Sequence, residues 1–211
     1  MINNLIVNVE SKTNKITNND KIAIITYHFS EIMRALGIDL QNDSVKDTPK
    51  RVAKMYVNEI FYGLNKKNKP KFKLFRNSVK YENMLIVKDI QIYSVCEHHF
   101  LPFIGTACVA YIPNKKLIGL SKINRIVDYF CRQPQLQEKL TNNILDELSH
   151  ILHTENVLVT IKATHLCVML RGIKDRTSET VTLAVKGKFK SKKLQNQFYL
   201  QLNSYNENRT I

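Results

Sequence analysis

The stretch CEHHFLPF, residues 96–103, separates two apolar segments of the chain and gathers side chains that can bind metal or carry protons. Cys96 and His99 form a C-x2-H pair, a spacing that suits two ligands on one zinc ion. Far downstream, His165 and Cys167 lie inside another apolar run. If that run is one strand, both side chains point to the same face, because side chains alternate along a strand.

These side chains are compatible with more than one kind of site. Cys96, His99 and Cys167 would supply three soft ligands, which suits a catalytic zinc that leaves its fourth position to water. A structural zinc would need a fourth protein ligand. The alternative is a chance pairing, since a lone buried cysteine usually packs in a core. His98 and His165 favour the site, because neither has an obvious core role and histidine carries protons near neutral pH.

Length and composition restrict the class of protein. The chain has 211 residues, of which 44% are hydrophobic, and this is enough for one packed domain. No apolar run reaches the ~18 residues that span a bilayer, and residues 1–20 lack the basic start and apolar centre of a signal peptide. The 4 cysteines do not suggest a disulfide framework in a chain of this length. We therefore expect a reduced, cytoplasmic protein with no membrane partner.

The formal net charge of +14 is compatible with either nucleic acid or a polyanionic small molecule as ligand. The lysines are spread along the chain and do not form one basic tract. The chain is also rich in Asn, Lys and Ile, a bias that AT-rich coding produces without selection for charge. We therefore expect no nucleic-acid partner, whereas a triphosphate ligand would need only a few of these charges.

Hydrophobic periodicity predicts a polar arm, then helices, then a core of strands and helices. The arm covers residues 1–19, and a basic loop covers residues 64–82. Asp20 is expected to cap the first helix, Gly37 to end it, and Ser121 to cap a later helix. The expected helices span residues 20–36, 48–62, 122–131, 135–153 and 192–204. The expected strands span residues 84–95, 103–112, 157–170 and 180–189.

The core order of these elements is strand, strand, helix, helix, strand, strand. That order predicts an α+β fold with a four-stranded antiparallel sheet. Because the chain shows no repeat or low-complexity linker, we expect a single domain over residues 20–211. Its expected parts are N-terminal helices in 20–63, a core in 84–190 and a C-terminal helix in 192–204. The free edges of such a sheet favour an oligomer, since neighbouring subunits can pair with them.

Several stretches form an ordered set of motifs along the chain. They are TPKRVAKMYVNEIFYG (48–63), CEHHFLPF (96–103), GLSKINR (119–125), QPQLQEKLT (133–141) and HLCVMLRG (165–172). This set resembles the motifs of the GTP cyclohydrolase I family, and the resemblance runs from about residue 20 to about residue 205. It implies the tunnelling fold, in which subunits join their sheets into a barrel. It also implies homo-oligomers, namely decamers of two pentameric rings with active sites at subunit boundaries.

The resemblance further implies a reaction and a metal. In the family, zinc activates water to attack C8 of the guanine in GTP; the imidazole ring opens, formate leaves, and 7,8-dihydroneopterin triphosphate forms as the first step of pterin and folate biosynthesis. His165 matches the general acid of ring opening, and His98 and Ser121 match groups assigned to later proton transfers. A buried hydrogen-bonding role for His98 and a helix cap for Ser121 are the alternatives. The residues that match the zinc ligands are Cys96, His99 and Cys167, for which Fe(II) and Mn(II) can compete.

The resemblance also implies residues that bind the substrate. Glu138 matches a carboxylate that accepts hydrogen bonds from guanine N1–H and the 2-amino group, a pair that adenine lacks, and Gln137 lies beside it. Without this match, a glutamate early in a helix is more often solvated. For any single arginine the alternative is an ordinary surface charge. The cations that match triphosphate contacts are Lys122, Arg125, Arg171 and Arg51, the last contributed by a neighbouring subunit.

Two other interpretations compete with this one. Another tunnelling-fold enzyme, acting on a pterin or a deazapurine, would share the guanine-type carboxylate, but the zinc set and GLSKINR disfavour it. A basic nucleic-acid-binding protein with a structural zinc would have no use for His98, His165 and Glu138 together. An ordinary GTPase is disfavoured because the chain has no Walker-type glycine loop. Cys108 and Cys131 carry no motif, and we expect both to pack in the core.

Overall fold

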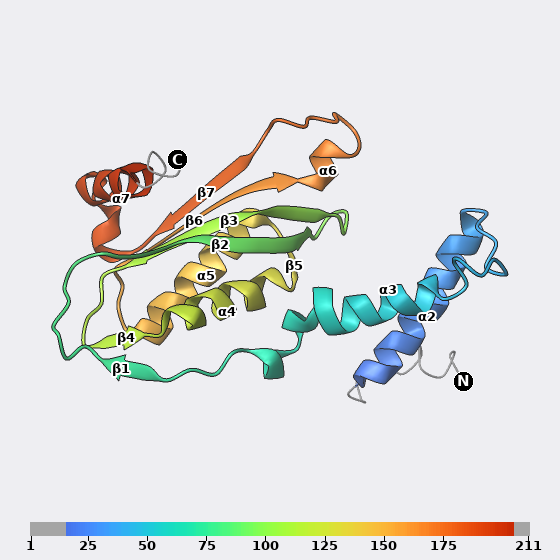
Figure 1. Ribbon diagram of the computed structural model, residues 1–211, viewed down its shortest axis with the longest axis horizontal. Coiled ribbons are helices and arrows are strands. Elements are labelled where there is room, and N and C mark those ends of the chain that lie inside the picture. The colour runs from blue at the N-terminus through green and yellow to red at the C-terminus, as the bar shows by residue number, and fades with distance from the viewer. Residues whose placement is uncertain (1–15, 205–211) are drawn as a thin grey trace. The chain divides into compact units, whose positions relative to one another are not determined.

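The computed structural model in Figure 1 describes residues 16–204. Contacts group the chain into two compact units, Met1–Leu64 and Asn65–Ile211, and each is described by itself below. The single domain predicted from the sequence spans both units and stays a prediction. The predicted polar arm lies, as far as residue 15, outside the described residues. Among the helices that are described, none has the length and apolar character needed to cross a membrane.

The N-terminal unit begins with helix α2, Asn18–Ala35. Thr17 is its N-cap: the Thr17 hydroxyl accepts from the backbone N–H of Asp20, and the Asp20 carboxylate accepts from the backbone N–H of Thr17. Asp20, which we predicted as the cap, is thus the N3 residue of a capping box whose N-cap is Thr17. Gly37 follows the last turn with a φ of 77°, as predicted, because glycine adopts this left-handed conformation without a Cβ clash.

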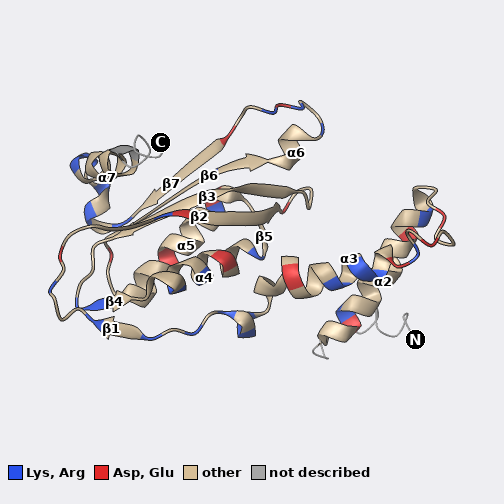
Figure 2. Ribbon diagram, viewed as in Figure 1, with Lys and Arg blue, Asp and Glu red and all other residues tan. Residues whose placement is uncertain are grey.

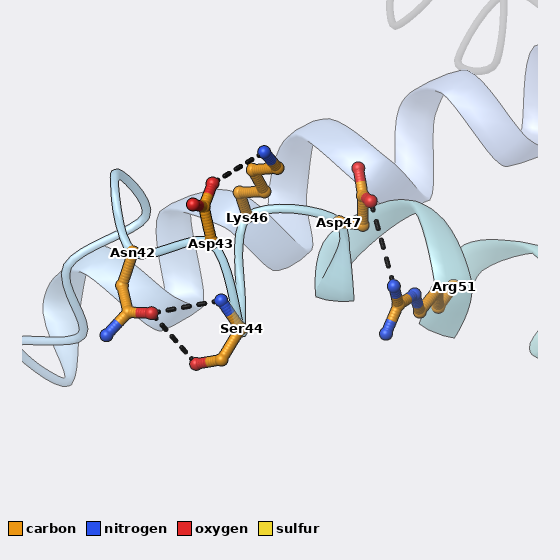
Figure 3. A network of polar contacts seen from close by, with 6 residues as sticks. All are labelled: Asn42, Asp43, Ser44, Lys46, Asp47 and Arg51. Carbon is orange, nitrogen blue, oxygen red and sulfur yellow. Dashed lines mark hydrogen bonds and ion pairs between the residues drawn. The ribbon is translucent and has the colours of Figure 1, made fainter.

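Helix α3, Thr48–Met55, starts with a proline in its first turn and packs against α2. It continues into a π-helical turn at Tyr56–Ile60 and a 3-10 turn at Tyr62–Leu64. Short-range polar contacts hold the connection from α2 to α3 in place (Figure 3). They join Ser44 to Asn42, Lys46 to Asp43 and Arg51 to Asp47.

The second unit contains a five-stranded sheet of order β5-β2-β3-β6-β7. Its strands are β2 Leu85–Cys96, β3 Pro102–Tyr111, β5 Pro134–Gln135, β6 Val157–His165 and β7 Thr180–Val185. The pairs β2–β3, β3–β6 and β6–β7 are antiparallel, whereas β5 pairs parallel with β2. A separate antiparallel pair joins β1, Leu74–Arg76, to β4, Lys116–Ile118. The α+β class is as predicted, but the main sheet has five strands instead of four.

Helices cover both faces of the main sheet (Figure 1). Helices α4, Leu120–Cys131, and α5, Gln137–Leu152, cover one face and form the larger core cluster with it. Helix α7, Lys192–Ser204, packs against one end of the other face, where a 3-10 turn at Gly187–Lys190 joins a smaller cluster. Neighbouring residues of one strand therefore enter different clusters, as side-chain alternation requires.

Two local predictions near the ends of these elements were wrong. Helix α4 has Gly119 as its N-cap, so Ser121 lies inside the first turn and does not cap the helix. The strand predicted over residues 157–170 ends at His165, and a single helical turn, α6 Leu166–Met169, follows it. A continuous apolar run does not distinguish one long strand from a strand followed by a helical turn.

Candidate active site

The turn between β2 and β3 brings the first two predicted metal ligands together. Cys96 is the last residue of β2, and its backbone N–H donates to the carbonyl of Leu101 at 2.9 Å. The N–H of Phe100 donates back to the carbonyl of Cys96, also at 2.9 Å, and Phe100 has a left-handed φ of 54°. His99 lies within this tight turn, which explains why the C-x2-H spacing places its ring close to the Cys96 thiol.

Cys167 reaches the same place by a different route. One ligand atom each from Cys96, His99 and Cys167 lies within 4.8 Å of the others. We predicted that Cys167 would share a strand face with His165, but the strand ends at His165 and α6 carries Cys167. The predicted convergence is therefore present, although the predicted strand geometry was wrong.

These donors fit one transition-metal ion. Two sulfurs and one imidazole nitrogen are ligand types of zinc sites, and their separations of at most 4.8 Å allow all three to contact one ion. Burial raises the pKa of the Cys167 thiol, and the neighbouring Cys96 raises it further. Two adjacent thiolates repel each other, and a divalent cation between them would reverse that repulsion. Among the described residues the group offers three potential protein ligands, the number typical of catalytic zinc sites.

Two more predicted residues lie beside this group. Arg171 is exposed, and its Nη1 lies 3.3 Å from Nε2 of His99. His98 is exposed, and its ring centroid lies 6.2 Å from that of His99 with the rings perpendicular. The structure thus places His98 beside the metal group and gives Arg171 a direct contact with one of its ligands.

His165 is held at the end of β6 by two contacts. Its ring stacks on Phe103, the residue opposite it in β3, with centroids 4.7 Å apart and an interplanar angle of 14°. Its Nε2 lies 2.8 Å from Oε1 of Gln137. Burial lowers the pKa of His165, and the nearby carboxylate of Glu138 opposes this effect. The general-acid candidate therefore has a defined ring orientation next to the first turn of α5.

The first two residues of α5 differ in their surroundings. The Gln137 side chain is 2% exposed and bonds to the backbone of β6 and β7 as well as to His165. Glu138 is exposed and available to a ligand. The predicted contact of Gln137 with guanine stays a prediction, while its internal bonds give it a role that the sequence did not suggest.

A cavity of about 640 Å³ lies beside the first turn of α4. Its lining includes Ser121 and Lys122, two of the predicted site residues, and Arg125 follows Lys122 by one turn of the same helix. Sequence reasoning missed Lys71 and Lys73, which also line the cavity. They lie just before β1, in a segment that we predicted as a basic loop. Figure 2 shows basic residues along this segment and on β4.

The remaining predicted cation belongs to the N-terminal unit. Arg51 lies in α3 and forms an ion pair with Asp47, one turn earlier, at 3.7 Å (Figure 3). Both side chains are largely exposed, so the pair is weak and leaves the guanidinium accessible.

Comparison with known proteins agrees with the motif set. The family model described as GTP cyclohydrolase I matches residues 25–203. The chain is 51% identical to GTP cyclohydrolase 1 of Flavobacterium johnsoniae, over 90% of this chain and 86% of that protein. It is 50% identical to GTP cyclohydrolase 1 of Wigglesworthia glossinidia brevipalpis, over 91% of each, and 49% identical to that of Salmonella arizonae, over 89% and 84%. The chain therefore belongs to the GTP cyclohydrolase I family.

Proposed function

We propose that this protein is a zinc-dependent GTP cyclohydrolase. It hydrolyses the guanine imidazole ring of GTP, releases formate and forms 7,8-dihydroneopterin triphosphate, the first step of pterin and folate biosynthesis. The observation that carries the proposal is the group of Cys96, His99 and Cys167 within 4.8 Å, in a chain of this family. The reduced thiols that such a site requires suit a cytoplasmic enzyme.

Cys96, His99 and Cys167 are the proposed zinc ligands. Zinc held there would act as a Lewis acid and lower the pKa of water enough for attack on an electrophilic carbon near neutral pH. The chain's own contribution is to fix the donor geometry through the turn after β2 and through α6.

Proton transfer is assigned to side chains around this group. His165, whose ring is held by Phe103 and Gln137, is the proposed proton donor to the purine during ring opening. His98 and Ser121 are the proposed groups for the later proton transfers of the ribose rearrangement. The exposure of both side chains supports this role, because a group that must reach substrate cannot be sealed in the core.

Glu138 is the proposed guanine-recognition residue, with Gln137 beside it. An exposed carboxylate on the first turn of α5 can accept hydrogen bonds from guanine N1–H and the 2-amino group together. Adenine presents a different edge and would leave the carboxylate unpaired, which provides discrimination against ATP.

The triphosphate is proposed to bind where cations meet the first turn of α4. Lys122 and Arg125 lie on that helix, and Arg171 lies beside the metal group. The cavity at Ser121 and Lys122 has room for phosphate oxygens, and its Lys71 and Lys73 add positive charge. Arg51 is the remaining proposed cation, and by the family pattern a neighbouring subunit supplies it.

Oligomerisation is part of the proposal. We infer a tunnelling-fold barrel built from the sheets of several subunits, and a decamer of two pentameric rings. The edge strand β7 supports this, since Val181 and Leu183 on it are exposed and would be covered by a neighbouring sheet.

The proposal is tested by turnover of GTP. Purified, zinc-loaded protein is incubated with GTP, and formate release is followed together with dihydropterin absorbance, with ATP as the control substrate. We expect both products from GTP, neither from ATP, and neither from a Cys167→Ser variant. Bound zinc without either product would contradict the proposed function and favour another tunnelling-fold activity.

A further inference from the structure

We propose that Gln137 is a positioning residue that fixes which nitrogen of His165 exchanges a proton. Gln137 holds a hydrogen on Nε2 of His165, so that Nδ1 is the nitrogen that gives or takes the catalytic proton. The assignment of the hydrogen to Nε2 follows from hydrogen bonding alone. The catalytic use of Nδ1 rests on the proposed function and deepens it.

The orientation of the Gln137 side-chain amide is fixed by its backbone partners. Its Nε2 lies 3.1 Å from the carbonyl oxygen of Ile161 in β6 and 3.0 Å from that of Thr180 in β7. Carbonyl oxygens only accept hydrogen bonds, so the amide NH2 must face them. A flipped amide would place Oε1 against two carbonyl oxygens in a buried position, which is strongly unfavourable.

A pair of threonine hydroxyls points to the same orientation. Thr141 donates its hydroxyl hydrogen to the carbonyl of Gln137 at 2.7 Å. Thr182 lies 2.7 Å from the Thr141 hydroxyl and must therefore be the donor of that pair, since a hydroxyl has one hydrogen. The Thr182 oxygen is then free to accept from Nε2 of Gln137 at 3.1 Å. Among the described residues, each hydrogen-bond partner of this Nε2 is thus an acceptor.

The amide oxygen of Gln137 in turn fixes the ring of His165. With its NH2 group directed at the strands, Gln137 presents Oε1 to Nε2 of His165 at 2.8 Å. An amide oxygen only accepts, so His165 must carry a hydrogen on Nε2. The neutral ring is then the Nε2–H tautomer, and the doubly protonated ring gains its second proton on Nδ1. In both states His165 keeps the hydrogen on Nε2 and donates it to Oε1 of Gln137.

Ring rotation does not offer an easy alternative. A half-turn of the imidazole would replace Nε2 by a carbon opposite Gln137 and break the 2.8 Å hydrogen bond. The stack on Phe103 confines the ring to its present plane. Because Gln137 is buried, its unpaired oxygen would then have no water to compensate it. The geometry therefore selects one nitrogen for proton exchange.

The direct test reads the hydrogen on His165 without any substrate. Full-length, zinc-loaded protein with 15N-labelled histidine is sedimented, and solid-state NMR correlates each ring nitrogen with its attached hydrogen, well above the ordinary histidine pKa of about 6.5. A His165→Asn variant assigns the signals. We expect a protonated Nε2 and an unprotonated Nδ1. A hydrogen on Nδ1 would overturn the inference, even in a fully active enzyme.

Variants test whether Gln137 is the cause. Gln137→Met keeps the length of the side chain but removes the acceptor, so we expect a mixture of tautomers. We also expect kcat to fall by about 10- to 100-fold, as for other residues that orient a catalytic group, with zinc content little changed. An unchanged tautomer in this variant would overturn the role of Gln137, and so would an unchanged kcat.

Thr141→Val is the matched control. It removes a buried hydrogen bond from the same network but leaves the contact between Gln137 and His165 in place. We expect this variant to keep the wild-type tautomer and kcat even if its stability falls. Loss of the Nε2–H signal in Thr141→Val would show that the contact between Gln137 and His165 is not sufficient to select the tautomer, and would overturn the inference. Because the spectrum is recorded without GTP, absence of turnover would contradict the proposed function and not the tautomer assignment.

Discussion

Two pairs of cysteines lie in different regions of the second unit and have different chemistry. Cys96 and Cys167 lie at one end of the main sheet, whereas Cys108 lies within β3 and Cys131 at the end of α4. Burial alone does not separate Cys96 from Cys108, since Cys96 is 6% exposed and Cys108 is 7% exposed. The neighbouring side chains separate them, because His99 and Cys167 lie close enough to Cys96 for all three to bind one ion. A buried thiol becomes a metal ligand only where other donors converge on it.

The strongest test of this comparison removes a cysteine sulfur at each of the two places. Cys96→Ala removes a proposed ligand, and we expect zinc loss and a fall in GTP turnover beyond the roughly 10- to 100-fold typical of indirect partners of a metal. Cys108→Ala removes a thiol of equal burial, and we expect zinc content and turnover to stay near wild type.

Metal analysis and formate release measure both variants. Equal zinc content in Cys96→Ala and wild type would show that Cys96 is not a ligand. Loss of zinc from Cys108→Ala at intact folding would show that burial, and not convergence of donors, controls metal binding.

A second prediction extends the comparison from the metal to the substrate at the same end of the sheet. Glu138→Gln removes the charge that is proposed to pair with guanine, and we expect kcat/KM for GTP to fall about 10- to 100-fold, the effect of losing a hydrogen bond to a charged group. Zinc content should not change. The neighbouring Lys139→Gln, which removes an ion pair of 3.8 Å with Glu97, is the control and should retain most of the activity. Similar losses in both variants would argue against a specific role for Glu138.

Thiol alkylation distinguishes the two pairs without mutation. Burial raises the pKa of both Cys108 and Cys131 to about 12, so near pH 8 only about one in ten thousand of these thiols is ionised. After removal of metal by a chelator, we expect iodoacetamide to modify Cys167, which is partly exposed, at least about tenfold faster than Cys108 or Cys131. Peptide mass spectrometry measures each site. Raising the pH should increase modification of all of them, since more thiolate forms.

Zinc-loaded protein is the control for that experiment. We expect the metal to protect Cys96 and Cys167 and to leave the slow reaction of the core pair unchanged. Protection of Cys108 by zinc, at constant folding, would contradict the assignment of the core pair to packing.

The smallest expected effect lies at the opposite end of β3. The Tyr111 hydroxyl is fully buried beside the backbone of Ile118 and has no hydrogen bond of normal geometry with the described residues. Tyr111→Phe should therefore change the free energy of unfolding by less than about 1 kcal/mol. Urea denaturation measures this change. Ile92→Ala, which removes packing from the same core, should cost about 2–5 kcal/mol and shows the scale of a true core defect.

The long periodic elements could be predicted from the sequence because each buries one face. Helices α4, α5 and α7 and the four antiparallel strands begin within a few residues of the expected positions, although β6 and β7 end earlier than the predicted 170 and 189. The short strands β1, β4 and β5 could not be found, since two or three residues show no periodicity. Their positions depend on pairing with strands that are distant in the sequence.

In the candidate site, likewise, some residues could be identified from the sequence and some contacts could not. Cys96, His99 and Cys167 could be identified because their residue types suit zinc and few other roles. The approach of Cys167 through α6 could not, because a helical turn hidden in an apolar run has no local signal. Gln137 was placed beside guanine by its position next to Glu138. Its contact with His165 depends on where α5 meets β6 and β7, which is a property of the folded chain.

The two-residue strand β5 restricts the length of the connection between β5 and α5. The N–H of Glu97 donates to the carbonyl of Gln135 at 3.1 Å, and α5 begins only two residues later. An α-helix turns by about 100° per residue. One residue inserted after the N-cap Leu136 as the new first residue of α5 would therefore change which side chain faces His165, without altering any existing side chain. The junction can therefore accept substitutions at Leu136, whose backbone alone caps the helix, but it cannot accept insertions or deletions.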